Sequence, residues 1–165
     1  MMIRGEGGCL RGKELGRLHR NSERKFYRTL RGLEHDPQVE QMKQYTQHKG
    51  TVTFQHCRRV AVSSFHLAQK LGWRIDEDAL ARGAMLHDFH LYTREKKDVR
   101  HLFKHPRLAL RNAEKTFDLN DKEKNIITSH MWPLTVLNVP KSKEAVLVML
   151  ADKYCAFREM HGRRH

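Results

Sequence analysis

An aspartate within the most apolar segment of the chain is the feature that most constrains its fold. The segment from Ser142 onward has the composition of a buried helix, and in helical register Asp152 lies on the same stripe as Val148 and Met149. A buried carboxylate without a partner is costly or changes its pKa. Lys153 is a poor partner, because adjacent helical residues diverge by about 100°. Asp152 therefore needs a partner from elsewhere in the chain.

Helix signals recur along the sequence, whereas strand signals are weak. Capping and stop residues predict helices over residues 13–33, 53–71, 76–88, 106–117, 120–131 and from 142 to near the end of the chain. Thr53, Asp76 and Asn120 are the predicted N-caps, and Pro106 suits a first helical turn. Residues 89–104 lack clean periodicity and are predicted to form a basic loop. The sequence thus predicts an all-α fold, a helical bundle of five or more helices.

Three histidines lie on the apolar stripes of other predicted helices. His56 falls in the first turn of its helix, whereas His87 and His130 end theirs. Gly83, one turn before His87, would let a neighbouring helix approach closely. Together with Asp152, four helices each present one metal-capable side chain on the buried face. Imidazole and carboxylate ligands suit Mn, Fe, Zn or Co, so the pattern predicts a metal site in the core of the bundle.

The order of these residues resembles that of the HD-domain phosphohydrolases. The resemblance is carried by HCRRVAVSSFHLAQKLG, ALARGAMLHDFH, HPRLAL, IITSHMWPL and VLVMLADKYCA, over roughly residues 50–160. The adjacent His-Asp pair that names the family is His87-Asp88. The resemblance implies six metal ligands, namely His56, His87, Asp88, His105, His130 and Asp152. His105 and His130 match the histidines that hold a second ion in some members, and Asp88 would bridge the two ions.

One departure from the family pattern follows the His-Asp pair. Many members continue with Ile-Gly-Lys, whereas this chain continues with Phe89-His90-Leu91 and lacks the lysine that can contact a phosphate. Basic residues of the following segment are candidates to bind substrate phosphates in its place: Arg94, Lys96, Lys97 and Lys104. His90 and His101 are further candidates to line the site or to transfer protons.

The resemblance implies a metal-dependent phosphohydrolase that acts on a phosphate ester or anhydride, with a nucleotide as the expected substrate. The expected cofactor is one or two divalent ions of Mn, Fe, Co or Zn. Because a metal lowers the pKa of its bound water from about 15.7 toward ~7, the expected nucleophile is a metal-bound hydroxide, with Asp88 and His87 as catalytic residues. Two alternatives remain: an RNA- or nucleotide-binding module with a structural metal, and a di-iron oxygenase on the same ligands.

Charge and composition bound the partners and the location. The net charge is +13, and residues 1–31 contain nine Lys or Arg against three Asp or Glu. Residues 1–33 are predicted to be a basic, partly disordered N-terminal extension that offers a surface for nucleic acid, and residues 34–165 an HD-like metal-binding helical domain. No apolar run approaches the ~20 residues of a membrane span, and the N-terminus lacks a signal peptide, so a cytoplasmic location is expected.

Overall fold

The computed structural model of the chain describes residues 10–46, 50–89 and 99–162. Within these residues it forms α-helices, one 3-10 helix and no β-strand beyond an isolated bridge between Thr46 and Val52. The elements are α1 (Leu10–Glu34), α2 (Pro37–Glu40), η1 (Gln41–Gln44), α3 (Thr53–Lys70), α4 (Glu77–Leu86), α5 (Val99–Thr116), α6 (Asp121–Ser129) and α7 (Lys143–His161). The prediction of an all-α bundle of five or more helices is confirmed.

Side-chain caps start several helices where the sequence predicts them. The Asp76 carboxylate accepts a hydrogen bond from the backbone N–H of Ala79 at the start of α4. Asn120 and Glu123 form a reciprocal capping box at the start of α6, with each side chain accepting from the other's backbone N–H. The start of α3 is displaced by one residue, because Thr53 is its first residue and Val52 is the cap.

The predicted basic loop over residues 89–104 is wrong for its last part. Helix α5 begins at Val99, so Pro106 lies inside a helix rather than in its first turn. Proline has no N–H to donate to the preceding turn, and α5 lacks one backbone hydrogen bond there. Ala109 and Ala113 are nonetheless buried on one face of α5, which packs against α6. Residues 90–98 lie outside the described part of the chain.

Two other helices end slightly earlier than predicted. Helix α4 ends at Leu86 and α6 ends at Ser129, so His87 and His130 are C-cap residues, and neither helix reaches Asp88 or Met131. Both caps keep right-handed helical backbone angles. The side chains of both histidines therefore still point into the core, as predicted from the apolar stripes of their helices.

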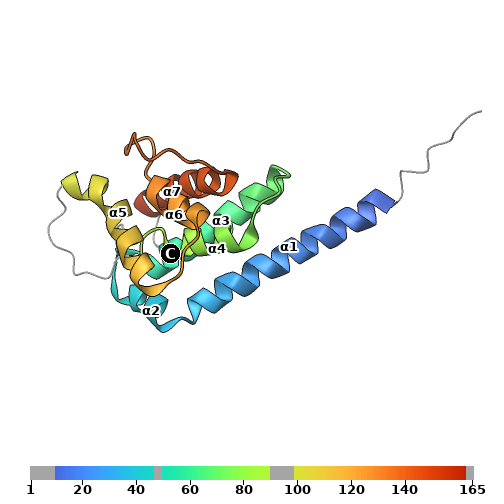
Figure 1. Cartoon of the computed structure of the whole chain (residues 1–165), viewed down its shortest axis with the longest axis horizontal. Coiled ribbons are helices and arrows are strands. Elements are labelled where there is room, and N and C mark those ends of the chain that lie inside the picture. Colours follow the sequence, from blue (N-terminus) through green and yellow to red (C-terminus); the bar gives the residue numbers. More distant parts are fainter. Residues whose placement is uncertain (1–9, 47–49, 90–98, 163–165) are drawn as a thin grey trace, which may run out of the picture.

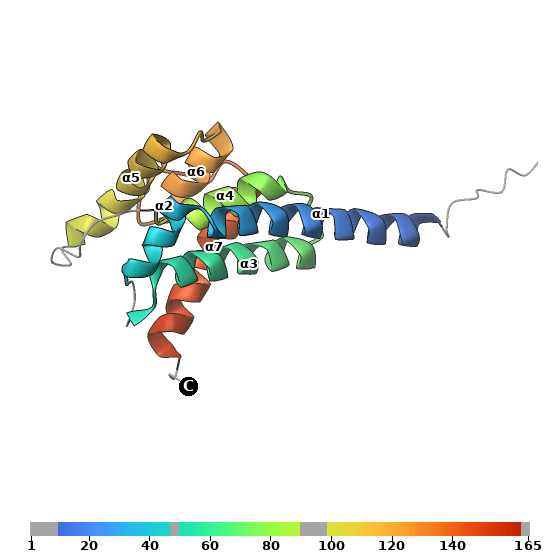
Figure 2. The same cartoon turned by 90° about the horizontal axis from the view of Figure 1, so that it is seen from below.

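Helix α1 is packed on the bundle over its C-terminal half and projects beyond it over its N-terminal half (Figures 1 and 2). Phe26 and Leu30 are buried against the core, whereas Leu15 and Leu18 of the same predicted stripe are 67% and 50% exposed. Helix α1 begins at Leu10, three residues before the predicted start at residue 13. The division into an extension and a domain at residue 33 remains a prediction.

Helix α4 occupies the centre of the fold, where it contacts α1, α3, α6 and α7. Its approach to α6 is very close at Gly83, where an added Cβ would lie 2.6 Å from Cδ1 of Ile126. The close helix contact predicted at Gly83 is thus confirmed. It places the His-Asp pair after α4 beside the histidine that ends α6. None of the described helices has the length and apolar character needed to cross a membrane.

Candidate metal centre

The structure brings the six predicted ligands together in the core. They come from five helices or helix ends, namely His56 of α3, His87 and Asp88 after α4, His105 of α5, His130 after α6 and Asp152 of α7. All six are buried. Each helix supplies its ligand from the apolar face by which it packs, which is why a polar cluster forms inside the core.

The partner of Asp152 is His56, 96 residues away in the sequence. Nε2 of His56 lies 3.0 Å from Oδ1 of Asp152, and Nε2 of His87 lies 3.7 Å from the same oxygen. Lys153, the sequence neighbour, does not contribute to this pairing. Its ammonium instead donates to the backbone carbonyl of His130 at 3.1 Å, at the end of α6.

His87 and His130 are held in the same way. In each, Nδ1 lies 2.7 Å from the backbone carbonyl oxygen three residues earlier, that of Ala84 for His87 and that of Ile127 for His130. Because a carbonyl only accepts, Nδ1 carries the proton and donates. When these rings are neutral, the contact fixes the tautomer in which the Nε2 lone pair is directed into the cluster, the form that binds a metal.

His105 and His130 form a second group of candidate ligands near one carboxylate oxygen of Asp88. Oδ1 of Asp88 lies 3.4 Å from Nε2 of His105 and 3.7 Å from Nε2 of His130. The two imidazole nitrogens are 2.8 Å apart. A hydrogen bond at that distance requires one of the two imidazoles to supply the proton, whereas a metal ion between them would be bound by both lone pairs.

The donor atoms are spaced as ligands of a common ion would be. Three triads each have donor atoms within 4.8 Å of one another: His56 with His87 and Asp88, His87 with His130 and Asp152, and Asp88 with His105 and His130. In addition, the fully buried Nε2 of His87 has no hydrogen-bond partner among the described residues. Such a nitrogen is costly in a core unless it binds something. Chemistry, spacing and burial therefore all suit a divalent metal.

Proton affinities in the cluster also indicate a need for positive charge. Burial opposes protonation of His56, but hydrogen bonds with Asp152 and Glu159 raise its pKa to about 10. Burial and the positive charge of His87 lower the pKa of His130 to about 3. Burial also opposes protonation of His87, but nearby negative charge raises its pKa. Without a cation, His56 and His87 are therefore protonated to balance the carboxylates, while His130 stays neutral. A divalent ion supplies that charge directly.

One side chain that contacts a candidate ligand was missed by the sequence reasoning. The Glu159 carboxylate is 5% exposed, lies 3.0 Å from Nδ1 of His56, and contacts Arg59 with its other oxygen at 2.8 Å. Glu159 stands two helical turns after Asp152, so it faces the same side of α7. That spacing was the available signal.

The predicted phosphate-binding residues are only partly described. Lys104 lies on α5 with an exposed side chain, next to His105 in the sequence. Arg94, Lys96, Lys97 and His90 lie outside the described residues, as does the side chain of His101.

The family comparison agrees with this geometry. The family described as HD domain matches residues 53–156 of the chain. This chain belongs to the HD-domain family. The match includes all six candidate ligands, whereas Glu159 lies three residues beyond its end. HD domains bind divalent metals and are generally phosphohydrolases. No curated protein and no solved structure is significantly similar to the chain.

Proposed function

We propose that this HD domain is a metal-dependent phosphohydrolase that cleaves a phosphate ester or anhydride, with a nucleotide as its substrate. The observation that carries the proposal is the position of Asp88, which belongs to two of the three metal-capable triads. One carboxylate shared between two triads can contact two ions, the arrangement found in hydrolases that displace a leaving group at phosphorus. Membership of the HD-domain family supports the same reaction class.

The candidate ligands would bind the metal ions, and backbone carbonyl groups would orient two of them. A bound divalent metal lowers the pKa of a water molecule and neutralises charge on the phosphoryl oxygens. His56, His87, Asp88 and Asp152 would hold one ion, and His105 and His130 would complete a second site with Asp88. The carbonyl groups of Ala84 and Ile127 orient two of these imidazoles.

Nucleophilic catalysis by a cysteine is not needed and is not favoured. Cys155 is buried one helical turn after Asp152, and its Sγ lies 3.7 Å from Oγ of Ser63. Burial raises the pKa of the Cys155 thiol, which disfavours the reactive thiolate. Water activated at the metal ligands is therefore the nucleophile that we propose.

The proposal of a nucleotide substrate rests on basic residues near the candidate ligands in the sequence and on membership of the HD-domain family. Lys104 is exposed beside His105 and is available to a phosphate, and the sequence offers Arg94, Lys96 and Lys97 nearby in the chain. A nucleotide carries the anionic groups that such residues bind. The cytoplasmic location likewise remains a prediction from the sequence.

A hydrolysis panel tests the proposed activity. The protein, reconstituted separately with Mn, Fe, Co and Zn, would be assayed for phosphate release from nucleoside mono-, di- and triphosphates. Asp88→Asn should lower activity by more than the ~10- to 100-fold that loss of a residue supporting a metal ligand costs. Asp118→Asn makes the same chemical change at an exposed position and should be fully active. Absence of turnover with every metal, or full activity of Asp88→Asn, would remove the proposal.

A further inference from the structure

Helix α1 carries a row of arginines on the face that points away from the core. The row consists of Arg17, Arg20, Arg24, Arg28 and Arg31, all exposed. At 100° per residue, their spacing of three or four residues keeps them within about 80° of one another, opposite the buried Phe26 and Leu30. At 1.5 Å per residue the row is about 21 Å long. The solvent face of α1 is thus a continuous strip of guanidinium groups.

The acidic residues that contact α1 form their ion pairs with other side chains than these five arginines. Glu77 and Asp78 of α4 lie against the other side of the helix, where they pair with Lys25 at 3.4 and 3.2 Å. Arg31 donates from Nε to the backbone carbonyl of Tyr27 at 3.2 Å. Among the described residues, no carboxylate lies within ion-pair distance of the five arginines. Their charge is available to an external anion.

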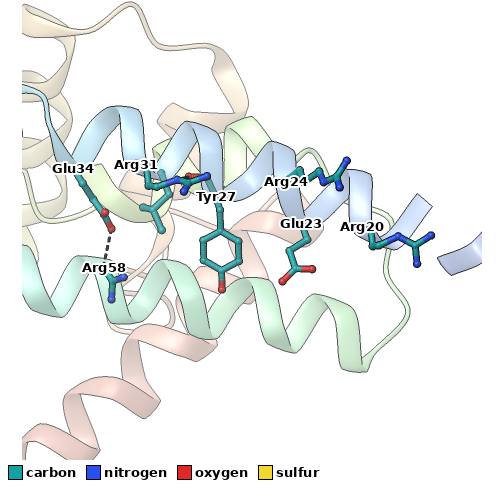
Figure 3. A pocket seen from close by; sticks show the side chains of 8 residues that line it. Arg20, Glu23, Arg24, Tyr27, Arg31, Glu34 and Arg58 are labelled. Atoms are coloured by element: carbon teal, nitrogen blue, oxygen red, sulfur yellow. Dashed lines mark hydrogen bonds and ion pairs between the residues drawn. The ribbon is translucent and has the colours of Figure 1, made fainter. Parts of the chain in front are cut away.

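A groove adjoins the row between α1 and α3 (Figure 3). It has a volume of about 470 Å³, and its lining includes Arg20, Arg24, Arg31, the ring of Tyr27 and Arg58 of α3. Two carboxylates, Glu23 and Glu34, also line it, but Glu34 is paired with Arg58 at 2.8 Å. Positive charge therefore still predominates in a concave site that could receive part of a ligand lying along the row.

We propose that the arginine row of α1 and the adjoining groove bind the phosphate backbone of a nucleic acid. One guanidinium group can donate two parallel hydrogen bonds to two oxygens of a phosphate, which favours arginine over lysine for this contact. A row of about 21 Å is long enough to contact several successive phosphates of one strand. The surface lies on a different element from all six candidate metal ligands.

An anionic membrane is a poorer match for this surface. A helix that lies on a bilayer inserts an apolar face between its basic flanks. The apolar face of α1 is instead covered by protein at Phe26 and Leu30, and the exposed Leu15 and Leu18 lie outside the arginine row. Over Arg24, Arg28 and Arg31 the helix therefore offers charge without an exposed apolar face to insert, which suits a phosphate backbone.

Binding of a labelled single-stranded RNA, followed by fluorescence anisotropy at several salt concentrations, tests the proposal. If five phosphates are neutralised, affinity should fall about 100-fold between about 50 and 200 mM salt, since the slope for single strands is ~0.7 per contact. The variant Arg20→Gln/Arg24→Gln/Arg31→Gln should bind more weakly and lose only about 7-fold over the same range. A single-stranded DNA of the same sequence should bind with similar affinity, because the contacts are to phosphates.

Two controls make the outcome specific. Arg111→Gln/Lys115→Gln/Lys141→Gln removes three exposed charges from α5 and the segment before α7, and it should bind RNA like the parent. Asp88→Asn should also bind like the parent, so that loss of hydrolysis and loss of nucleic-acid binding are separable. The proposal is overturned if the α1 variant binds RNA as tightly as the parent, or if the parent binds phosphatidylserine vesicles but neither RNA nor DNA.

Discussion

Nδ1 of His56 lies 3.0 Å from Oε2 of Glu159, in a contact that joins the first turn of α3 to the last turns of α7. The carboxylate accepts a hydrogen bond from Nδ1–H, so that Nε2, which faces the cluster that contains Asp152, is the nitrogen that can bind a metal ion once it has lost its own proton. A carboxylate behind a metal-binding imidazole both orients the ring and increases its basicity. Glu159 is therefore a positioning residue for the candidate metal centre.

Replacement of Glu159 should weaken metal binding without removing a ligand. Glu159→Gln keeps the size of the side chain but removes its charge, and we expect metal affinity to fall by about 10- to 100-fold. Competition with a chromogenic chelator, using Co or Zn, measures this directly. Glu114→Gln makes the same change at an exposed pair with Lys124 and should leave affinity unchanged. Equal affinities of Glu159→Gln and the parent would show that the contact has no role in metal binding.

The triad that contains His105 predicts the metal stoichiometry. Because Asp88, His105 and His130 could hold an ion beside the one held by His56, His87, Asp88 and Asp152, the reconstituted protein should hold up to two ions per chain. His130→Ala should retain one ion, because His56, His87, Asp88 and Asp152 are unchanged. Elemental analysis after dialysis is the measurement, with His161→Ala as a control on an exposed histidine. A parent protein that never exceeds one ion, even with excess Mn or Fe, would exclude His105 and His130 as ligands of a second ion.

Metal removal should destabilise the fold. The folded protein presents an assembled site and the unfolded chain does not, so metal at about 100 times its Kd adds roughly 2.7 kcal/mol to the free energy of unfolding. For a chain of this size that corresponds to a rise in Tm of about 5–11 °C. Thermal melts with a chelator and then with added Mn, Fe or Co measure it, and Asp88→Asn should show a smaller rise. A Tm that no metal shifts would argue for a purely structural His-Asp cluster.

The contact between α4 and α6 should not tolerate a side chain at Gly83. The added Cβ would lie 2.6 to 2.9 Å from three atoms of Ile126, including its Cβ, so rotation of the isoleucine side chain cannot relieve the clash. Overpacking of this kind costs about 1–3 kcal/mol, against a gain of ~1 kcal/mol in helix propensity for alanine. We expect Gly83→Ala to be destabilised in denaturant unfolding. Gly32→Ala of α1 has no atom within 4 Å of its new Cβ and should be as stable as the parent or more so.

Local patterns were sufficient to predict most of the helices and four of the six candidate ligands. The capping box at Asn120 and the cap at Asp76 act within one turn, so the sequence alone specifies where those helices begin. The position of Asp152 on an apolar stripe likewise requires only helical periodicity. From these local facts the sequence determined that four helices would each direct a metal-capable residue into the core.

Tertiary structure decided what no local pattern encodes. The contacts of His56 with Asp152 and Glu159 join residues about 100 positions apart, and they exist because α3 and α7 pack side by side. Dependence on tertiary packing also explains where the sequence predictions for α5 and α1 were wrong. Burial of one face of α5 continues a helix through Pro106, and the absence of a packing partner leaves Leu15 exposed on a stripe that buries Phe26. Periodicity fixes which face of a helix is apolar, but only the neighbouring helices determine how much of that face is buried.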